Sequence, residues 1–477
     1  MDKQTSWCRL NMRCSTGKFS TGKLSRRSFL GLGVAAGLSA ATASASQAPG
    51  RGRAKQVLIV FEQGGLSHMD TWDPKPAAIA EHRSSFKPVD TNVPGIQFTE
   101  LLAKTARHAD KLAVVRSMHH RISVSGHPDG TQYLLSGVRP GGPIAMPDVG
   151  SVVAKLIGSP CGYLPPYIMA PGNGEQSYNA SQGFLSPGYK VFKTTGRDLS
   201  DPSWRVPDLR LLDGIAPERF RDRQDLLSRL NLGLLSAAPG QRTGGMDEFY
   251  AKAFDLLSNP KTQAAFELSR EPDAVRDRYG RGHRGQCYLL GRRLIEQGVR
   301  FVVLDVREPE TKATPGGFNM NWDHHDFIYA SGSCGTIRDK AGGEGRYGIA
   351  HWCMMGSTDQ AFAALVGDLD ERGLLDETLV CFVTEFGRTP KLNKFQGRDH
   401  WTNAYSIAFA GAGVRGGQVI GRTDRDGGFV QDRPYTPDDY AATVYEFLGI
   451  DREQPIFTPD NRPIYLAAEG TFMSELL

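Results

Sequence analysis

Hydrophobic residues occur along the chain in short runs, separated by polar, glycine-rich or proline-rich stretches. Each run is apolar at nearly every position and is shorter than an average helix, which is typical of strands buried on both faces of a parallel sheet. Gly64-Gly65 closes the first of these runs with a turn signal. The sequence therefore predicts buried strands at 56–61, 111–117, 166–170, 300–306, 378–385 and 406–413.

Between these runs, apolar residues recur at intervals of three and four, as on the buried face of a helix. One such stretch ends at Gly298, before the expected strand at 300–306, and another ends at Gly373 before the next strand. A last helix is expected at 438–450. This order predicts a doubly wound, mostly parallel α/β sheet with helices on both faces. Ligands of such sheets bind beyond the carboxyl ends of the strands, so the residues after each strand are the candidates for chemistry.

One domain at 56–477 accounts for the pattern, with an insertion at about 171–298. The insertion begins with a stretch rich in Gly, Pro and Ser that has no clear period, and continues from about residue 216 with helical spacing. Residues 46–55 are expected to form a flexible linker before the domain.

The first 45 residues resemble an export signal. Arg26-Arg27 stand before the apolar stretch FLGLGVAAGLSAATA, which is too short and too rich in Gly and Ala for a typical transmembrane helix. Ala43-Ser44-Ala45 is a small-residue cleavage pattern, and the arginine pair is similar to twin-arginine signals. We therefore expect the twin-arginine machinery to export the chain to the periplasm or the extracellular space. An ordinary Sec signal or an uncleaved anchor is the alternative.

Removal of this signal changes the charge balance. The signal holds seven of the 56 Lys and Arg and one of the 52 Asp and Glu, which leaves 49 basic against 51 acidic residues. An almost neutral body lacks the basic surface that nucleic-acid binding requires, so we expect no nucleic-acid partner. No other apolar run reaches about 18 residues, so we expect no transmembrane span in the mature chain. The five remaining cysteines form no Cys-x-x-Cys pair, which argues against a zinc–thiolate site.

Acidic residues crowd the loop after the first expected strand. Glu62, Asp70 and Asp73 lie there together with His68, and carboxylates so near each other repel unless they are paired or share a cation. Turn formation is the alternative for this loop, since Asp-Pro sequences start turns. Glu62 is the candidate metal ligand because it stands at the end of the strand.

Three histidines follow the second strand: His119, His120 and His127. Histidine is the most frequent metal ligand and titrates near neutral pH, so three on one loop favour a function over scattered surface positions. A helix is expected to begin near Gly130, and its N-terminus would offer backbone N–H groups to an anion.

The strongest local metal signal is Asp323-His324-His325-Asp326, after the strand at 300–306. In an extended chain Asp323 and His325 point to one face, and a carboxylate with a neutral imidazole suits zinc, manganese or iron. A solvated polar loop is the alternative.

Glu385, Arg388, Asp399 and His400 follow the strand at 378–385. Arg388 keeps its charge and presents a planar fork that suits sulfate, phosphate or carboxylate, with a salt bridge to Glu385 as the alternative. His400 is a further candidate ligand, and Asp399 is the carboxylate expected to orient it. The ends of four strands would thus bring acids and histidines to one side of the sheet.

Together, TLVCFVTEFGRTP, GRDHW, GGLSHMDTWDPKP and SRRSFL resemble the exported bacterial family called domain of unknown function 1501, over about residues 55–450. The resemblance implies the alkaline-phosphatase-like fold of the alkaline phosphatase and sulfatase superfamily. It also implies a divalent metal, namely zinc, manganese, iron or calcium, and an anionic small-molecule or polysaccharide ester as substrate.

The same resemblance assigns roles to single residues. LLSG at 134–137 matches the Leu-Leu-Thr-Gly ending that follows the sulfatase nucleophile, and the nucleophile position falls on His127. His127 would act as nucleophile or acid–base catalyst in an enzyme; binding a metal and marking an inactive site are the alternatives. Phe386 stands where the superfamily's Asp-His-Gly has its histidine ligand, so part of a two-metal site is lost. Arg388 would stabilise developing negative charge. The residues that match the remaining metal positions are Glu62, Asp323, His325, Glu385 and His400.

Two hypotheses follow from these matches and departures. The first is an exported metal-dependent hydrolase of a phosphate or sulfate ester, with an altered metal and nucleophile site and direct attack by water. The second is a non-catalytic protein that binds sulfated or phosphorylated polymers at the cell envelope.

Overall fold

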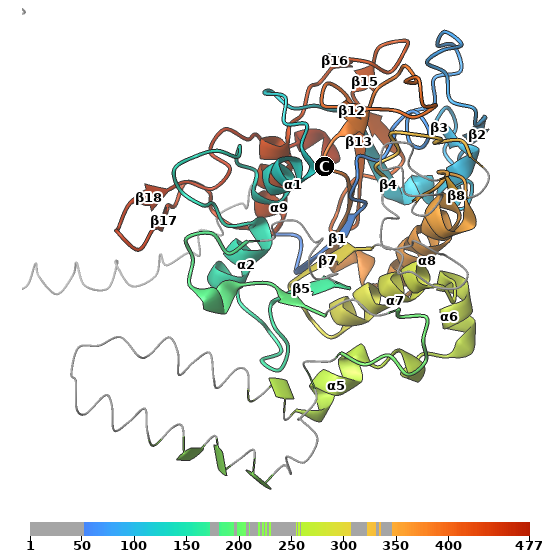
Figure 1. Cartoon of the computed structure of the whole chain (residues 1–477). Coiled ribbons are helices and arrows are strands. Elements are labelled where there is room, and N and C mark those ends of the chain that lie inside the picture. Colours follow the sequence, from blue (N-terminus) through green and yellow to red (C-terminus); the bar gives the residue numbers. More distant parts are fainter. Residues whose placement is uncertain are drawn as a thin grey trace, which may run out of the picture. The chain divides into compact units, whose positions relative to one another are not determined.

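The computed structural model describes residues 52–477 except 172–180, 195–197, 207–208, most of 210–258, 307–321, 331–332 and 335–345. The expected signal at 1–45 and most of the expected helical segment between 216 and 258 lie outside the described residues. Within the described part, eight strands form the central sheet in the order β14-β4-β13-β10-β1-β7-β5-β6 (Figure 1).

The strands of the central sheet are β1 (Gln56–Phe61), β4 (Leu112–Met118), β5 (Tyr167–Ala170), β6 (Phe192–Lys193), β7 (Phe301–Asp305), β10 (Thr378–Val383), β13 (Tyr405–Ala410) and β14 (Gln418–Ile420). The six strands expected from the sequence are all present. Short β6 and β14 at the two edges were not expected, because runs of two or three residues leave no readable pattern.

Strand direction confirms the mostly parallel α/β fold. β1 pairs in parallel with both β10 and β7, and β5 pairs in parallel with β7. β13 is antiparallel to both of its neighbours, β10 and β4, so β4 runs in the same direction as β10. The carboxyl ends of β1, β4, β7 and β10 therefore meet at one edge of the sheet.

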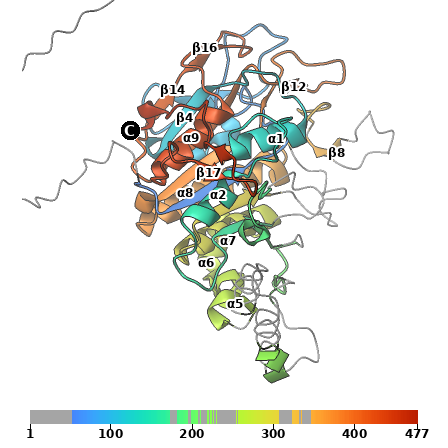
Figure 2. The same ribbon diagram turned by 90° about the vertical axis from the view of Figure 1, so that its left-hand side faces the viewer.

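Helices cover both faces of this sheet. The helices of the described residues are α1 (His127–Ser136), α2 (Val149–Leu156), α5 (Pro260–Phe266), α6 (Asp273–Tyr279), α7 (His283–Glu296), α8 (Ser357–Glu371) and α9 (Pro437–Phe447). Figure 1 shows α7 and α8 on one side of β1 and β7, and α1, α2 and α9 on the other. In the view of Figure 2, α6 again lies beside α7, with which it is in contact.

Alternating residues of β1 build the two core layers. Leu58 and Val60 pack in the layer that contains α7 and α8, whereas Val57, Ile59 and Phe61 pack in the layer that contains α2 and α9. All five are at most 2% exposed. Burial of one such side chain stabilises a fold by about 1.5–3 kcal/mol, so a strand buried on both faces contributes strongly.

Gly291 lets α7 lie close against β7. A Cβ atom at Gly291 would lie 2.9 Å from both Cδ atoms of Leu304. A larger residue would push the helix off the sheet, although glycine costs a helix about 1 kcal/mol relative to alanine.

Five two-stranded sheets and several short helices complete the described part. The small sheets pair β2 (Pro88–Asp90) with β3 (Gln97–Thr99), β8 (Ser333–Cys334) with β9 (Arg346–Tyr347), β11 (Gly387–Arg388) with β12 (His400–Trp401), β15 (Arg422–Thr423) with β16 (Val430–Asp432), and β17 (Ile456–Phe457) with β18 (Pro463–Ile464). The short helices are η1 (Glu100–Leu102), η2 (Thr105–Lys111), η3 (Pro187–Tyr189), η5 (Leu268–Arg270), η7 (Trp352–Gly356), η8 (Leu375–Glu377) and η9 (Ser474–Leu476). Among the described helices, none has the length and apolar character needed to cross a membrane.

Candidate metal centre

α1 brings His127 to the carboxyl edge of the sheet. The sequence predicted a helix start near Gly130, but α1 begins at His127, with Gly126 as its N-cap residue. Pro128 fits the first turn because that turn needs no backbone donor inside the helix. His127 therefore sits in the first helical turn rather than on the preceding loop.

The pairing of β11 with β12 brings Arg388 beside His400. The two residues are direct partners in the antiparallel register, so their side chains share one face of the small sheet. Both side chains reach the same atom, Oδ1 of Asp323, with Arg388 Nη2 at 2.5 Å and His400 Nε2 at 3.0 Å.

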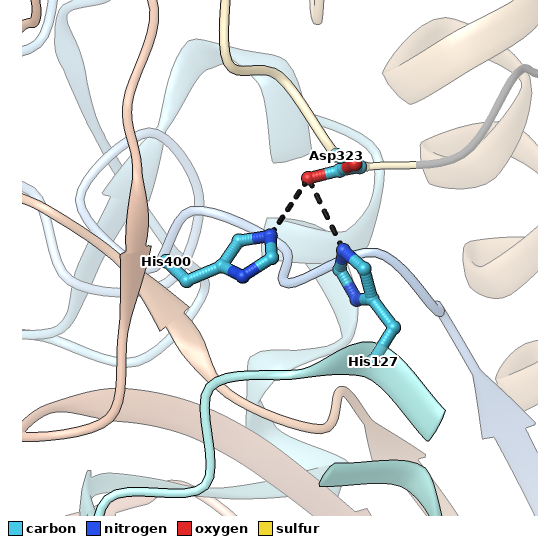
Figure 3. Close-up of side chains that lie close together, drawn as sticks. All are labelled: His127, Asp323 and His400. Carbon is cyan, nitrogen blue, oxygen red and sulfur yellow. Dashed lines mark hydrogen bonds and ion pairs between the residues drawn. The ribbon is translucent and has the colours of Figure 1, made fainter. Parts of the chain in front are cut away.

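Asp323 is the centre on which three histidines converge. Its Oδ1 atom lies 3.2 Å from His127 Nε2, 2.9 Å from His325 Nε2 and 3.0 Å from His400 Nε2. The ligand atoms of His127, Asp323 and His400 all lie within 4.8 Å of one another. Figure 3 shows the carboxylate of Asp323 facing these two rings, which come from α1 and β12.

The other ring nitrogen of each histidine faces an acceptor. His127 Nδ1 lies 2.6 Å from Glu385 Oε1, and His325 Nδ1 lies 2.8 Å from Asp399 Oδ1. His400 Nδ1 lies 2.5 Å from the carbonyl oxygen of Ser125. Because carboxylate and carbonyl oxygens only accept, each Nδ1 must carry the proton and donate it. A neutral ring then has a bare lone pair on Nε2.

The Nε2 atoms of three histidines thus surround one carboxylate oxygen, and each carries a lone pair when its ring is neutral. Neutral rings would repel this oxygen unless protons or a metal cation lie between them, and Arg388 Nη2 already donates one hydrogen bond to it. Histidines that ligate metals regularly donate their second nitrogen to a carboxylate or a backbone carbonyl, as all three do here. The donor set of three imidazoles and one carboxylate fits a divalent transition metal such as zinc, manganese or iron.

Local electrostatics agree with a need for positive charge. Burial opposes the charged form of His127, but its hydrogen bonds to Asp323 and Glu385 prevail and raise its pKa to about 9. Burial would raise the pKa of Asp323, but Arg388 and the three histidines hold it well below its usual range. Burial, together with the charges of Arg388 and His127, lowers the pKa of His400, although Asp323 opposes this shift.

The side chains of the cluster are partly exposed. The four side chains are between 15 and 21% exposed, whereas those of Glu385 and Arg388 are 0% exposed. The Nε2 atom of His127 is itself buried, and of the groups that orient the cluster, Glu385 and Arg388 are buried whereas Asp399 is 45% exposed.

Arg388 does not fit the expected role of an anion clamp. Its Nε donates to Gly65 O at 2.9 Å and its Nη1 to Arg398 O at 2.9 Å, and its Nη2 donates to Gly64 O as well as to Asp323. A buried guanidinium bound in this way cannot turn to meet a substrate. Arg388 instead fixes Asp323 and offsets its charge.

Glu385 lies behind His127 rather than among the converging atoms. Its carboxylate accepts from Gly64 N at 2.9 and 3.1 Å, from Thr384 Oγ1 at 3.1 Å and from His127. Burial would raise the pKa of Glu385, but the hydrogen bonds from His127 and Gly64 hold it below its usual value. The expected ligand is therefore placed as the carboxylate that orients His127.

The structure places Glu62, an expected ligand, beside Arg284, Tyr288 and Trp322 rather than among the atoms that converge on Asp323. Its carboxylate accepts from Arg284 Nη1 at 2.8 and 3.1 Å, from Tyr288 Oη at 2.5 Å and from Trp322 Nε1 at 2.5 Å. These donors use both oxygens and neutralise the charge.

The sequence predicted that Asp399 orients its neighbour His400. In the structure it instead binds His325. Asp399 lies just before β12, and its carboxylate meets Nδ1 of His325, whose Nε2 lies near His400. The carbonyl of Ser125, which binds His400 instead, was missed because a backbone atom leaves no signal in a sequence.

The acids of the first loop serve the fold. Asp70 pairs with Arg398 at 3.0 Å, and both side chains are 0% exposed.

His120 donates from Nε2 to the carbonyl of Glu385 at 2.9 Å, and burial lowers its pKa to about 4. It supports the strand end without facing Asp323.

A model of one protein family matches residues 54–477, almost the whole described chain. The chain belongs to this family, described as protein of unknown function (DUF1501). Among curated proteins, no sequence match was found.

Solved structures similar to this DUF1501 protein include two phosphonate monoester hydrolases and a sulfatase. SpPMH from Silicibacter pomeroyi is 12% identical, with 83% of this chain and 73% of that chain covered and a TM-score of 0.37. The hydrolase of Agrobacterium radiobacter is 10% identical, with 88% and 77% covered and a TM-score of 0.37. PsFucS1 sulfatase from Pseudoalteromonas sp. is 13% identical, with 86% and 70% covered and a TM-score of 0.35. Similarities this low say nothing about the activity of the DUF1501 protein, whose site must be judged from its own residues.

Phe386 shows how the DUF1501 protein closes one side of its cluster. The ring lies 5.0 Å from the ring of His127 and 4.7 Å from that of His400, and it is fully buried. A phenyl ring excludes water and ligates nothing, so this side of the cluster is apolar.

Proposed function

We propose that this protein is a metal-dependent hydrolase of phosphate or sulfate esters with a single metal centre. The observation that carries the proposal is the convergence of three histidine Nε2 atoms on Asp323 Oδ1, with each Nδ1 donating to an acceptor. His127, Asp323, His325 and His400 would hold the metal. In this assignment His127 is a ligand and not the nucleophile.

A divalent metal bound there would act as a Lewis acid toward the ester oxygen. The residues of the chain prepare the site for it. Glu385, Asp399 and the Ser125 carbonyl hold the three Nδ1 protons, and thereby keep the Nε2 lone pairs directed at the centre. Arg388 fixes the orientation of Asp323. Phe386 excludes water from the side of the cluster where its ring packs against His127 and His400. Because the converging atoms are imidazole nitrogens and a carboxylate oxygen, we take water as the nucleophile.

We also propose that the protein works outside the cytoplasm. Arg26-Arg27, the short apolar stretch and Ala43-Ser44-Ala45 support export by the twin-arginine machinery to the periplasm or the extracellular space. Expression with Arg26-Arg27→Lys-Lys tests this proposal, since the loss of the arginine pair should retain the chain inside the cell. Equal export of both forms would contradict it.

The first experiment is elemental analysis of the purified protein beside its Asp323→Ala and His400→Ala variants. We expect close to one equivalent of zinc, manganese or iron in the unmodified protein and almost none in either variant. His108→Ala is the control, because His108 is a partly buried histidine of η2 outside the cluster. It should keep the metal.

Turnover is then measured with aryl sulfate, aryl phosphate and aryl phosphonate esters in the presence of each metal. Hydrolysis that the His400→Ala variant loses and the His108→Ala variant keeps would support the enzyme. A bound metal with anion binding but no turnover would favour the second hypothesis, a non-catalytic protein that binds sulfated or phosphorylated polymers. A folded protein that takes up no metal would contradict the proposed centre.

A further inference from the structure

The segment that supplies Asp323 and His325 has neither helix nor strand to hold it. It begins in the described chain at Trp322 and makes tight turns, with His324 N donating to Trp322 O at 2.9 Å and His325 N donating to Asp323 O at 3.0 Å. Such a segment keeps its place only through contacts with the elements around it.

One anchor of this segment is a buried charged network beneath the sheet edge. Glu62 follows β1 directly and is 1% exposed, and Trp322 is also 1% exposed. The indole Nε1 of Trp322 donates to Glu62 Oε2 at 2.5 Å, and the guanidinium of Arg284 lies 5.5 Å from the indole ring. Hydrogen bonds to a charged group are about twice as strong as those between neutral groups.

α7 holds Glu62 in turn. Arg284 and Tyr288 are four residues apart, so they lie on one face of the helix, and both donate to the Glu62 carboxylate. Glu62 therefore links three parts of the fold: the end of β1, the helix α7 and the irregular segment that follows Trp322.

The backbone at Gly64 fixes the same segment from a second side. A Cβ atom at Gly64 would lie 2.5 Å from Trp322 N and 2.7 Å from Asp323 N. Gly64 has a φ of +115°, which favours glycine. Trp322 N also donates to Gln63 O at 3.1 Å. Residues 62–64 thus contact both the side chain and the backbone of the residue that precedes Asp323.

We propose that Glu62 is a positioning residue, which holds Trp322 and through it places Asp323 for the metal. This inference rests on the metal centre of the proposed function, but it assigns Glu62 a role that neither a metal ligand nor a general core residue would have. Glu62 acts through Trp322, which precedes Asp323, and would not contact the metal itself.

Two matched substitutions test the link. Glu62→Gln strands the buried guanidinium of Arg284 and can unfold the chain, so Trp322→Phe is the informative variant because it removes only the indole donor. Trp72→Phe is its control. Trp72 is also 1% exposed, its Nε1 has no hydrogen-bond partner among the described residues, and it packs against Phe98 and Phe382.

Two readouts on the full mature chain separate this inference from the proposed function. Hydrogen exchange of peptides covering 322–330 is measured in metal-free protein, and Zn²⁺ affinity is measured by competition with a chromophoric chelator. We expect Trp322→Phe to speed exchange of these peptides and to raise the Kd for Zn²⁺, each by about tenfold. Trp72→Phe should lower the melting temperature while leaving both readouts within about twofold.

The inference is overturned if Trp322→Phe leaves exchange unchanged, or if Trp72→Phe changes it equally. An unmodified protein that binds no Zn²⁺ or other divalent metal would refute the proposed function. The exchange comparison would still decide whether Glu62 and Trp322 place Asp323.

Discussion

The Nε2 atoms of His325 and His400 lie 2.9 Å apart, while the Nδ1 atom of each ring is committed to another acceptor. Two neutral rings in this arrangement present lone pairs to each other, and the contact is favourable only with a shared cation or proton. In the proposed metal centre this pair would form half of the binding site, and Asp323 and His127 would form the other half.

The first prediction concerns the carboxylate behind His325. Asp399→Asn keeps the shape but replaces a charged acceptor with a weaker, neutral one, which makes His325 Nε2 less basic. Affinity for Zn²⁺ should fall about tenfold, with little change in stability, because the Asp399 side chain is 45% exposed. Chelator competition measures the affinity. Asp376→Asn, at an exposed aspartate of η8, should leave it unchanged. Equal affinities of the two variants would contradict the orienting role.

The second prediction concerns Glu385. Oε1 of Glu385 accepts from both Gly64 N and His127 Nδ1, and Oε2 accepts from Gly64 N and Thr384 Oγ1. A glutamine that keeps its oxygen toward His127 replaces the charged acceptor with a neutral one and turns its NH2 group toward Gly64 N and Thr384 Oγ1, which then lose their acceptor on that side. We expect a loss of Zn²⁺ affinity of about 10- to 100-fold and a loss of about 1–3 kcal/mol in the free energy of unfolding.

Glu271→Gln is the control for Glu385→Gln. The Glu271 side chain is 7% exposed and pairs with Arg292 and Arg293, away from the cluster. Its substitution should reduce stability in urea unfolding but keep the metal. If both variants lose the metal, general loosening and not the orientation of His127 explains the effect.

The third prediction tests whether the apolar wall matters to the metal. Phe386→Ala and Phe362→Ala each remove a phenyl ring that is at most 1% exposed, and each should cost about 3–5 kcal/mol of stability. Phe386 packs against His127 and His400, whereas Phe362 packs in the core against Trp72 and Phe382. Only Phe386→Ala should also weaken Zn²⁺ binding. Equal Zn²⁺ affinities of Phe386→Ala and Phe362→Ala would show that the Phe386 ring does not influence the metal.

The pattern of apolar runs predicted the central strands because strands buried on both faces need apolar residues at every position. β1 was predicted at 56–61 and spans Gln56–Phe61. The antiparallel direction of β13 was not predictable, since direction depends on the connections and not on the composition of a strand. The same limit hid which acid meets which histidine: Asp399 is next to His400 in sequence but bonds to His325 in space.

The parallel topology made it predictable that the polar side chains after the strands come together at one edge of the sheet. The role of each of these residues was not predictable. Glu62, Glu385 and Arg388 were singled out because acids and arginines at strand ends suggest chemistry. Their burial separates them from His127, Asp323, His325 and His400. A carboxylate at a strand end becomes a ligand or an orienting group according to the donors that reach it, and those donors come from distant parts of the chain.

The last prediction concerns stability and pH at a site away from the metal centre. Asp148 is the N-cap residue of α2, where its carboxylate accepts from Ser151 N at 2.7 Å and from Tyr167 Oη at 2.9 Å. It is 3% exposed, and burial outweighs these bonds and raises its pKa to about 6. In the unfolded chain an aspartate has a pKa of about 3.9.

The folded state therefore holds this proton more tightly than the unfolded state does. The contribution of Asp148 to stability is fully present below about pH 4 and is lost as the pH rises through about 6. A difference of roughly two pKa units corresponds to about 3 kcal/mol. Asp148→Asn stays neutral throughout, can still accept from Ser151 N, and can donate to Tyr167 Oη. Relative to the unmodified protein, it should gain about 3 kcal/mol in the free energy of unfolding between pH 4 and pH 7. Urea unfolding at several pH values measures this difference, and a gap that stays constant with pH would show that Asp148 is already ionised in the fold.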